Sequence, residues 1–474
     1  MLEGLEIAEL SLQKAVNMYG ESRWDSEYYK KEFVADYNRI RQYPSKLLSD
    51  YSKYIRKGIF DISPEYYQTN GVPLIRTSEI KEPTISFNTT VFLSENINNQ
   101  FQQTVLKPND LVFTKIGAYI GDVAILPPTY ATYNFSQNVA GVSLMDANDG
   151  PHLLAFFLTH FGQNQIKRSA MLSGQGKLEL EDIRHYIIPN ICDKIKSKIK
   201  QVIDLSIKLN AQQRSMMQCA TKVLLEELKL CNWQPSEEST AIRTFSFAHA
   251  FKRWDAEYYQ PKYESCKNII ERYDGGFKSI SNICNIIDTT YQPQNGVTYK
   301  YIELANIGKN GEITGYTQGQ GEDLPSRARR IVRTGDVIVS SVEGSLQSCA
   351  IIPEELDGAL CSTGFYVIRS SFYTPESLLV LFKSMPIQML LKKGCTGSIL
   401  SAIGKTELEK ITLPLIDKTT QIIISQQVQQ SFELRAESKR LLEVAKRTVE
   451  IAIEVNEEKA IQYINDYGKS LYDK

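Results

Sequence analysis

The chain has 474 residues, which is enough for about three domains. Hydrophobic residues make up 42% and charged residues 23%, a composition that excludes a disordered or fibrous chain. The formal net charge of −1 excludes a protein that holds nucleic acid through a large basic excess. Any DNA contacts would need clustered basic residues, or partner chains that supply them.

The N-terminus and the cysteines indicate a cytoplasmic protein. The opening sequence MLEGLEIAELSLQ is acidic and has no apolar stretch that would predict a signal peptide. No apolar run reaches the roughly 18 residues that a membrane helix needs. The eight cysteines contain no CxxC pair, so the sequence predicts neither a zinc site nor a redox motif.

The chain contains an internal duplication, which is best identified before single elements are assigned. Residues 23–29 read RWDSEYY, and residues 253–259 read RWDAEYY. Further pairs follow in the same order: NGV, the segments KPNDLVF and RTGDVIV, and a proline that ends each copy. The offset stays between 225 and 230 residues, so we infer two copies of one domain.

The first copy has a mixed pattern of short strands and helices. Strands are predicted at 111–113, 123–126 and 139–144, bounded by turn residues, and a helix at 153–158. Residues 192–230 contain neither Pro nor Gly and carry apolar residues at helical spacing. They predict one amphipathic helix of roughly 58 Å, with a seam of Ile195, Ile199, Val202, Met216, Ala220 and Val223.

The second copy repeats this pattern. Strands are predicted at 337–339, 350–352 and 365–368, and a helix at 376–383. Residues 418–467 again lack Pro and Gly and predict a second long helix. A long helix with a narrow apolar seam needs a partner helix, and we expect the two to pair antiparallel. The alternative is that each helix folds onto its own domain.

These patterns predict an α+β fold with two duplicated domains, each followed by a long helix, and the helices pairing as an antiparallel coiled coil. We place the first domain at 1–190, the central helix at 191–231, the second domain at 232–414 and the C-terminal helix at 415–474.

Motifs for catalysis are absent from the sequence. An adenine methyltransferase needs an Asn/Asp-Pro-Pro-aromatic loop, but the only Pro-Pro pair follows Leu126 and precedes Thr129. Gly404-Lys405-Thr406 ends like a phosphate-binding loop, but Ile399 stands where that loop needs its first glycine. The four histidines form no metalloprotease or triad pattern. We expect the isolated chain neither to methylate nor to cut DNA.

Together these features resemble the specificity subunits of Type I restriction-modification systems. Residues 108–117 and 335–344 are similar to that family's GD-containing segment, and Ser136-Gln137-Asn138-Val139 is similar to its QN strand entry. Residues 173–189 and 397–414 resemble its closing stretch, and the RWDxEYY opening is typical of it. The second copy departs from the pattern, with Glu343 in place of Gly117 and Ser-Thr-Gly at 362–364 in place of Gln-Asn.

The resemblance implies a non-catalytic DNA-binding subunit that takes part in defence against phage. Its two target-recognition domains would each read one half of a bipartite, asymmetric site in double-stranded DNA. The paired helices would set the spacing and dock two methyltransferase subunits, and restriction-translocase subunits would join them. S-adenosylmethionine, ATP and Mg²⁺ would belong to those partners, so no cofactor and no membrane contact are expected for this chain.

DNA contact requires Lys or Arg for phosphates and forked or amide side chains for bases. In the first copy, the candidates beside the family-like loops are Arg76, Lys115, Tyr119, Gln137, Asn138, Gln175 and Lys177. In the second copy, the candidates are the run Arg327, Arg329, Arg330 and Arg333, and the closing-loop residues Lys392, Lys393 and Lys405. If all four arginines contact phosphates, their replacement should flatten the salt dependence of binding. The alternative is that these are solvated surface charges.

Two other functions remain open from the sequence. The chain could be the recognition subunit of a Type II system whose methyltransferase and nuclease are fused in a partner. It could also be a coiled-coil adaptor without a DNA role. Trp24 and Trp254 are expected to anchor a core or an interface and not to stack on bases.

Overall fold

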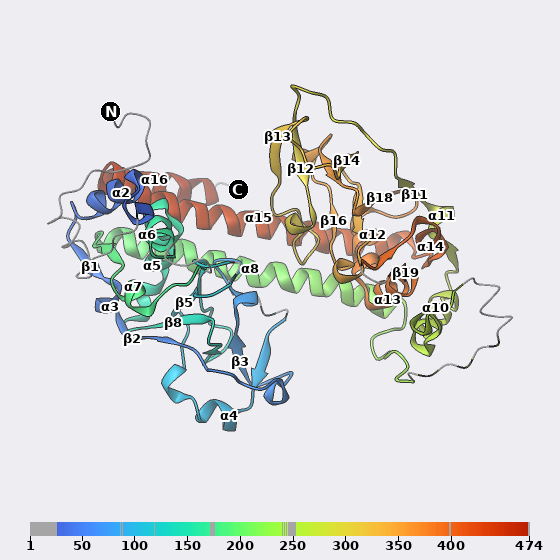
Figure 1. The fold of residues 1–474 in the computed structure, drawn as a ribbon, viewed down its shortest axis with the longest axis horizontal. Helices are drawn as coiled ribbons and strands as arrows, with labels where there is room; N and C mark the ends of the chain where they lie inside the picture. Colours follow the sequence, from blue (N-terminus) through green and yellow to red (C-terminus); the bar gives the residue numbers. More distant parts are fainter. Residues whose placement is uncertain are drawn as a thin grey trace. The chain divides into compact units, whose positions relative to one another are not determined.

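The computed structural model describes residues 26–85, 87, 89–117, 119–170, 176–238, 240, 242, 244, 253–397 and 400–472. Its contacts divide the chain into two compact units. One comprises Met1–Asn210 with Ala436–Lys474, and the other comprises Ala211–Arg435. Each unit therefore contains one copy of the duplicated domain together with parts of both long helices (Figure 1).

The first copy is built from short strands and helices, as the sequence pattern predicts. Its strands are β1 (Ser45–Leu47), β2 (Ser52–Lys57), β3 (Val72–Ile75), β4 (Val91–Leu93), β5 (Leu111–Thr114), β6 (Val123–Ile125), β7 (Asn134–Phe135), β8 (Val139–Leu144) and β9 (Ile187–Pro189). Its α-helices are α2 (Lys31–Ile40), α3 (Leu48–Tyr51), α4 (Glu95–Asn99), α5 (Gly150–Leu158), α6 (His160–Ala170) and α7 (Leu180–Arg184). Short 3-10 helices are η1 (Ser26–Tyr29), η2 (Pro64–Tyr66), η3 (Thr77–Glu79), η4 (Gln102–Thr104) and η5 (Ala147–Asp149).

The second copy repeats the arrangement. Its strands are β10 (Phe277–Ser279), β11 (Cys284–Ile287), β12 (Thr298–Ile302), β13 (Thr317–Gln320), β14 (Ala328–Ile331), β15 (Val337–Ser340), β16 (Cys349–Ile351), β17 (Leu360–Ser362), β18 (Phe365–Ser370), β19 (Cys395–Thr396), β20 (Ala402–Ile403) and β21 (Thr412–Pro414). Its α-helices are α10 (Pro261–Glu271), α11 (Ile280–Ile283), α12 (Pro375–Lys383), α13 (Met385–Gly394) and α14 (Lys405–Lys410). Its 3-10 helices are η6 (Ala256–Tyr259), η7 (Leu304–Asn306), η8 (Glu343–Ser345) and η9 (Glu354–Leu356).

The two copies share their sheet topology, which confirms the α+β fold. The main sheet has the order β2-β8-β5-β6 in the first copy and β11-β18-β15-β16 in the second, with antiparallel neighbours throughout. A second sheet has the order β4-β3-β7 or β13-β12-β17-β14, and each contains one parallel pair. Each domain is closed by a small antiparallel pair, in which Pro189 lies opposite Ser45 and Pro414 opposite Phe277.

The aspartate of the GD-containing segment is a structural residue in both copies. The carboxylate of Asp110 accepts hydrogen bonds from the backbone N–H groups of Lys107 and Leu144, both at 2.8 Å. Asp336 likewise accepts from the Arg333 N–H at 2.8 Å and pairs with the Arg369 guanidinium. The residue before each aspartate, Asn109 or Gly335, has a positive φ, which Gly and Asn tolerate best. The motif therefore shapes the turn that begins β5 and β15.

Two long helices follow the domains. Helix α8 spans Asp193–Glu227 and α15 spans Lys418–Glu454, with lengths of 35 and 37 residues. The sequence predicted one helix for 418–467, and this is corrected by the structure, because the segment breaks at Val455–Asn456 and continues as α16 (Glu457–Tyr472). Asn456 ends α15 without Pro or Gly, because its side-chain oxygen accepts from the Lys459 N–H at 2.9 Å and caps the next helix.

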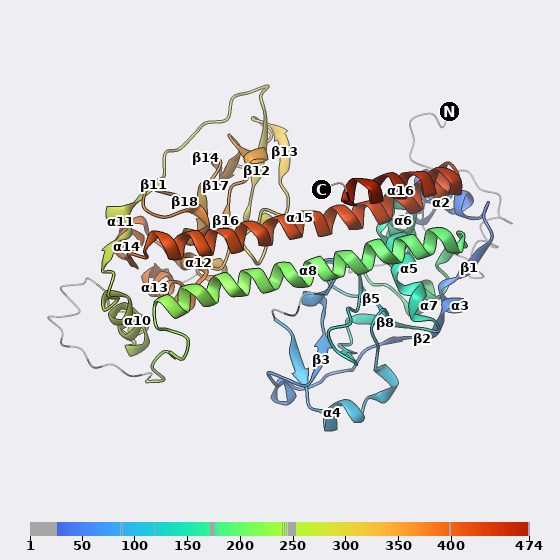
Figure 2. The same ribbon diagram turned by 180° about the vertical axis from the view of Figure 1, so that it is seen from behind.

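The helices pair antiparallel within each unit, which confirms the expected pairing (Figures 1 and 2). In the first unit, the Ser206 and Ser438 hydroxyls each donate to the other residue's backbone carbonyl, at 3.0 and 2.9 Å. In the second unit, the Gln213 amide donates to the Ser431 hydroxyl at 3.1 Å, and that hydroxyl donates to the Gln213 carbonyl. All four residues are almost fully buried.

The seam of α8 differs in part from the predicted apolar stripe. Ile195, Ile199 and Ala220 are fully buried as predicted. Val202, Met216 and Val223 lie only half-buried beside the seam, which continues instead through other residues. These are Ile203, Ser206, Ile207, Asn210, Gln213, Met217 and Leu224. Three of them are polar, so a search for apolar periodicity could not find them.

Each domain packs its core directly onto the paired helices. In the first unit, one apolar cluster joins the main sheet and α5 to Ile195 and Ile199 of α8 and to Val449 of α15. In the second unit, the corresponding cluster contains Leu224 and Ile424. Each fully buried aliphatic side chain contributes roughly 1.5–3 kcal/mol, so the helix pair and the domains stabilise one another. None of the described helices is both long enough and apolar enough to cross a membrane.

His152 on α5 makes the stability of the first unit sensitive to acid. The imidazole is 2% exposed, and neither ring nitrogen has a hydrogen-bond partner in the described part of the chain. Burial lowers the pKa of His152 to about 3, from a usual value near 6.5. The unfolded chain therefore binds more protons below pH 6.5, so stability falls as the pH drops from 6.5 toward 3.

We predict that His152→Leu removes this acid sensitivity. At pH 5 the buried histidine costs about 2 kcal/mol relative to neutral pH, and leucine carries no such cost. Urea unfolding of both proteins at pH 7.5 and pH 5 measures the effect. The drop in unfolding free energy between the two pH values should be smaller in the variant, and equal drops would contradict the assignment.

Candidate nucleic-acid interface

One end of the first main sheet gathers several of the predicted residues. Strands β2 and β5 both run antiparallel to β8, so both end where β8 begins. Lys57 ends β2, Lys115 follows β5, and Asn138 precedes β8. The segment before α7 joins them, because Lys177 bridges to Ile116 and the Leu178 N–H donates to the Lys115 carbonyl at 3.0 Å. Lys115, Asn138 and Lys177 are thereby brought together.

Three lysines at this end, here called the lysine cluster (Lys57, Lys115 and Lys177), interact as like charges. Lys115 is only 6% exposed, and its pKa is lowered first by burial and then by Lys177, with a smaller effect from Lys57. Glu179 opposes this effect, but its carboxylate already pairs with Lys177 at 2.7 Å. Phe60 is 70% exposed, and the centre of its ring lies 5.9 Å from the Lys57 ammonium.

The other candidates of the first copy occupy different positions. Gln137 is half-buried and Asn138 exposed, in the turn that leads into β8. Tyr119 is exposed in the β5–β6 hairpin, with the Lys81 ammonium 4.7 Å from its ring centre. Arg76 binds the buried Glu79 carboxylate and the Thr89 carbonyl, so it organises its own loop. Gln175 lies outside the described residues.

The second domain has the same scaffold but different side chains at this end. The Ser341 N–H donates to the Gly364 carbonyl, and the Ile403 N–H donates to the Ser341 carbonyl, both at 2.8 Å. These bonds match those of Lys115 with Asn138 and Leu178. By strand register and these bonds, Asp288, Ser341 and Ala402 take the places of Lys57, Lys115 and Lys177.

Positive charge at this end of the second domain comes from other positions. Lys405, at the start of α14, pairs with Asp288 at 2.6 Å. Arg330, on β14, donates to the Phe365 carbonyl and lies 5.4 Å from the Tyr366 ring centre. The pKa of Asp288 is lowered mainly by its hydrogen bond from Lys405, with a small contribution from Arg330. The structure therefore brings Arg330 and Lys405 together around an acid.

The arginine run does not form one uniform patch. Arg327 is exposed and Arg329 half-buried, whereas Arg333 pairs with Asp357 at 3.2 Å. Because Arg330 turns inward to β18, only part of the run is presented to solvent.

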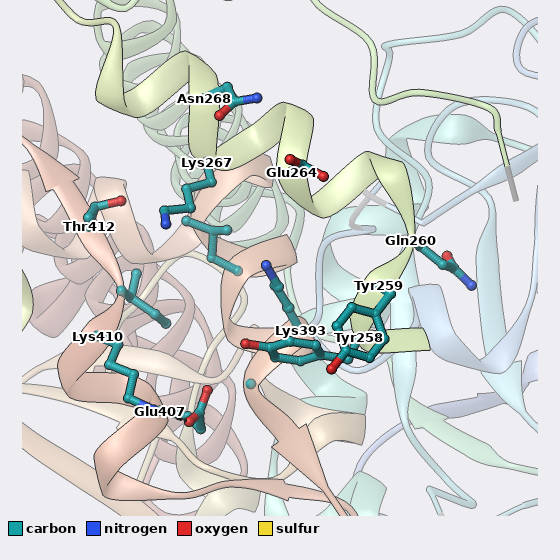
Figure 3. Close-up of a pocket in the computed structure, with 13 residues that line it drawn as sticks. Tyr258, Tyr259, Gln260, Glu264, Lys267, Asn268, Lys393, Glu407, Lys410 and Thr412 are labelled. Carbon is teal, nitrogen blue, oxygen red and sulfur yellow. Dashed lines mark hydrogen bonds and ion pairs between the residues drawn. The ribbon is translucent and has the colours of Figure 1, made fainter. Parts of the chain in front are cut away.

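Lys393 lines a pocket of about 280 Å³ in the second unit (Figure 3). Its ammonium lies 4.9 Å from the centre of the Tyr258 ring of the RWDAEYY motif. In the first domain, the equivalent Arg168 lies 3.8 Å from the Tyr28 ring centre, and Arg168 is almost fully buried. The cation–aromatic contact is therefore a repeated structural feature of the fold. Lys392 is exposed, 4.0 Å from Glu343.

The expectation for the tryptophans is partly corrected. Trp254 is 62% exposed, so it does not anchor a core. Trp24 lies outside the described residues. A role for Trp254 at an interface stays a prediction. Among the described residues, no group of three His, Cys, Asp or Glu side chains could hold a metal ion.

Sequence reasoning missed Lys57, Asp288 and Tyr366. They lie outside the family-like motifs, and only the strand pairing of β2 with β8 and of β11 with β18 brings them to the motif residues. An alignment of the two copies strand by strand could have shown that Lys57 and Asp288 occupy matched positions.

The family model for the Type I restriction modification DNA specificity domain matches residues 45–215. Residues 45–215 therefore form a domain of this family, and the predicted resemblance to specificity subunits is confirmed for this part of the chain. The matched region is therefore a DNA specificity domain. The second copy lies outside the matched residues, but its main sheet has the strand order of the first copy's main sheet.

Solved structures of such subunits are similar over most of the chain at low identity. The S subunit of the Type I system from M. genitalium is 13% identical, covers 89% of this chain and 96% of its own, and gives a TM-score of 0.36. The HsdS subunit from Thermoanaerobacter tengcongensis is 13% identical, with coverages of 87% and 97% and a TM-score of 0.29. Because these scores are low, the family assignment depends on the sequence match. No curated protein sequence matches the chain.

We predict that the arginines of the run differ in their effect on DNA binding. Replacing Arg327 and Arg329 with Gln should lower the slope of log affinity against log salt by about one unit for each phosphate that the variant no longer binds. Arg333→Gln should leave that slope unchanged, because its guanidinium pairs with Asp357. Fluorescence anisotropy with labelled target DNA at several salt concentrations measures both. Equal slopes for all variants and the wild type would contradict this division.

Proposed function

We propose that the chain reads a bipartite, asymmetric DNA target, with one half-site for each domain, and directs partner methyltransferase and restriction subunits to it. The observation that carries this proposal is the duplication of a DNA specificity domain on two antiparallel helices. Two readers on one support suit a target with two separated halves.

The difference between the domains supports an asymmetric target. Identical domains related by the repeat would favour identical half-sites, as paired readers of palindromic DNA do. Here the equivalent positions carry Lys57, Lys115 and Lys177 in one domain and Asp288, Ser341 and Ala402 in the other. Different side chains at matched positions favour different DNA contacts.

The helices are long enough to separate two half-sites. Helix α8, with 35 residues, measures about 52 Å at 1.5 Å per residue. Two major grooves on one face of DNA lie roughly 34–36 Å apart. In this proposal the helix pair is the ruler, and its outer surface receives two methyltransferase subunits. S-adenosylmethionine, ATP and Mg²⁺ are bound by the partners, and the complex works in the cytoplasm.

A recognition subunit of a Type II system with a fused methyltransferase-nuclease partner would have the same chain. An adaptor without a DNA role is the third possibility. The family match favours the two DNA-reading functions over the adaptor. If the purified complex retains a specific DNA sequence, the adaptor function is excluded. The identity of the partner chain then distinguishes Type I from Type II.

We predict that the two domains read independently. Exchanging residues of about 20–190 for the same segment of a related subunit should change one half of the methylated motif and leave the other half intact. Single-molecule sequencing of genomic DNA from a strain that carries the chimera reads out the motif. A folded, active chimera that alters both halves would refute independent reading.

We also predict that lengthening the helix pair lengthens the gap between the half-sites. Seven residues inserted after Leu209 and after Leu434, which are equivalent in the repeat, keep the seam in phase. The insertion adds about 10.5 Å, or about three base pairs at 3.4 Å each. An active complex that keeps the original gap in its methylated motif would show that the helices are not the ruler. The matched control is the same insertion in α8 alone, which breaks the pairing and should abolish methylation.

A further inference from the structure

The lysine cluster is a difference between two otherwise matched scaffolds. The strand ends, the two backbone hydrogen bonds and the isolated bridge are common to both domains. The side chains they present are three lysines in the first domain, and an acid, a hydroxyl and a methyl in the second. Since the fold does not require lysine at these positions, the cluster needs an explanation in function.

Lys115 carries an energetic cost in the free protein. The residue is only 6% exposed, and burying an ammonium is unfavourable unless an acid or several acceptors compensate it. Within the described residues, no carboxylate lies within 4 Å of its ammonium. The nearest acid identified electrostatically, Glu179, pairs with Lys177, and Lys57 adds repulsion.

An anion between the three ammonium groups would remove this cost. Lysine donates hydrogen bonds and accepts none, so a cluster of lysines fits a phosphate better than a base edge. The neighbouring side chains are the types that contact bases and backbone: the exposed Phe60 and the amides of Gln137 and Asn138. This setting favours a DNA phosphate over an acidic protein surface.

The second domain has no equivalent anion site among its described residues. Among the cations near its sheet end, Lys405 is paired with Asp288 at 2.6 Å, Lys392 lies 4.0 Å from Glu343, and Arg330 donates to a backbone carbonyl. A phosphate placed there would meet the Asp288 carboxylate. The two domains therefore differ in how charge is arranged at the same place: the first has three lysines, and the second has cations that are held by an acid or a carbonyl.

We propose that Lys57, Lys115 and Lys177 form a binding site for DNA backbone phosphate in the first domain, and that this domain supplies the larger share of salt-dependent binding. The inference rests on the proposed function, since it assigns the DNA contact of one of the two readers. It adds that the first domain makes more of the phosphate contacts than the second.

The test measures DNA affinity against salt concentration for the full chain in complex with its partner methyltransferase subunits. Replacing all three lysines with Gln should lower the slope of log affinity against log salt by about one unit for each phosphate that the variant fails to bind. The matched control is Lys107→Gln, an exposed lysine in the turn at the opposite end of β5. That control should keep the wild-type slope. The cluster variant should unfold at an equal or higher temperature, because the change removes like-charge repulsion.

A second test adds the lysines to the second domain, so that the expected result is a gain of salt-dependent binding. Asp288→Lys, Ser341→Lys and Ala402→Lys together should steepen the salt dependence by at least about one unit. A cluster variant with the wild-type slope, a control whose slope falls as much, or a second-domain variant with an unchanged slope would each overturn the inference. Unchanged DNA binding with release of the methyltransferase subunit would also overturn it, in favour of a protein contact. If the wild-type complex retains no specific DNA, the proposed function itself fails, and this outcome is distinct from the others.

Discussion

Helices α8 and α15 pair antiparallel within each unit, and the core of each domain packs onto this pair. Ser206 contacts Ser438, and Gln213 contacts Ser431, through buried hydrogen bonds. In the repeat, at an offset of 225 residues, Ser206 corresponds to Ser431 and Gln213 to Ser438. Each unit therefore contains one contact between the same two repeat positions. Serine at these positions lets each hydroxyl reach the backbone carbonyl of the opposite helix.

These polar contacts also favour one register. A slip of one heptad toward the N-terminal end of α15 would bring Gln213 opposite Ile424 and leave its amide unpaired, at a cost of about 1–3 kcal/mol. Single polar residues in helix seams fix register in this way in coiled coils. The domains add to the same effect, because their cores include the helix residues Ile195 and Leu224. In the proposed function, a single register keeps the distance between the two half-sites constant.

Comparison of the two copies distinguishes positions that have the same structural role in both from positions whose side chains differ. Asp110 and Asp336 hold the same turn in both copies, and the contact of Arg168 with Tyr28 returns as Lys393 with Tyr258. In contrast, none of the three residues of the lysine cluster is a lysine at the matched position of the second copy. Lys393 was a candidate for DNA contact from sequence, and its repeated ring contact gives it a structural role in addition.

The duplication, most strands and both long helices could be predicted from the sequence, because the motifs recur in order and the helical segments lack Pro and Gly. The break at Asn456 could not be predicted, because an asparagine cap is a weaker sequence signal for the end of a helix than Pro or Gly. The polar seam at Ser206 and Gln213 was missed because periodicity was sought in apolar residues. The candidate site was found only in part: Lys115 and Lys177 lie in motifs, whereas Lys57 joins them through strand pairing that is non-local in sequence.

In the proposed function, two unlike domains on one helix pair recognise the two halves of one bipartite target. The most direct measurement is single-molecule sequencing of methylated adenines in the genome of a strain that carries the intact system, compared with a strain that lacks this chain. We expect a motif of two different half-sites separated by a gap of fixed length, which disappears completely when the chain is absent. A contiguous or palindromic motif that depends on the chain, or methylation unchanged in its absence, would contradict the claim.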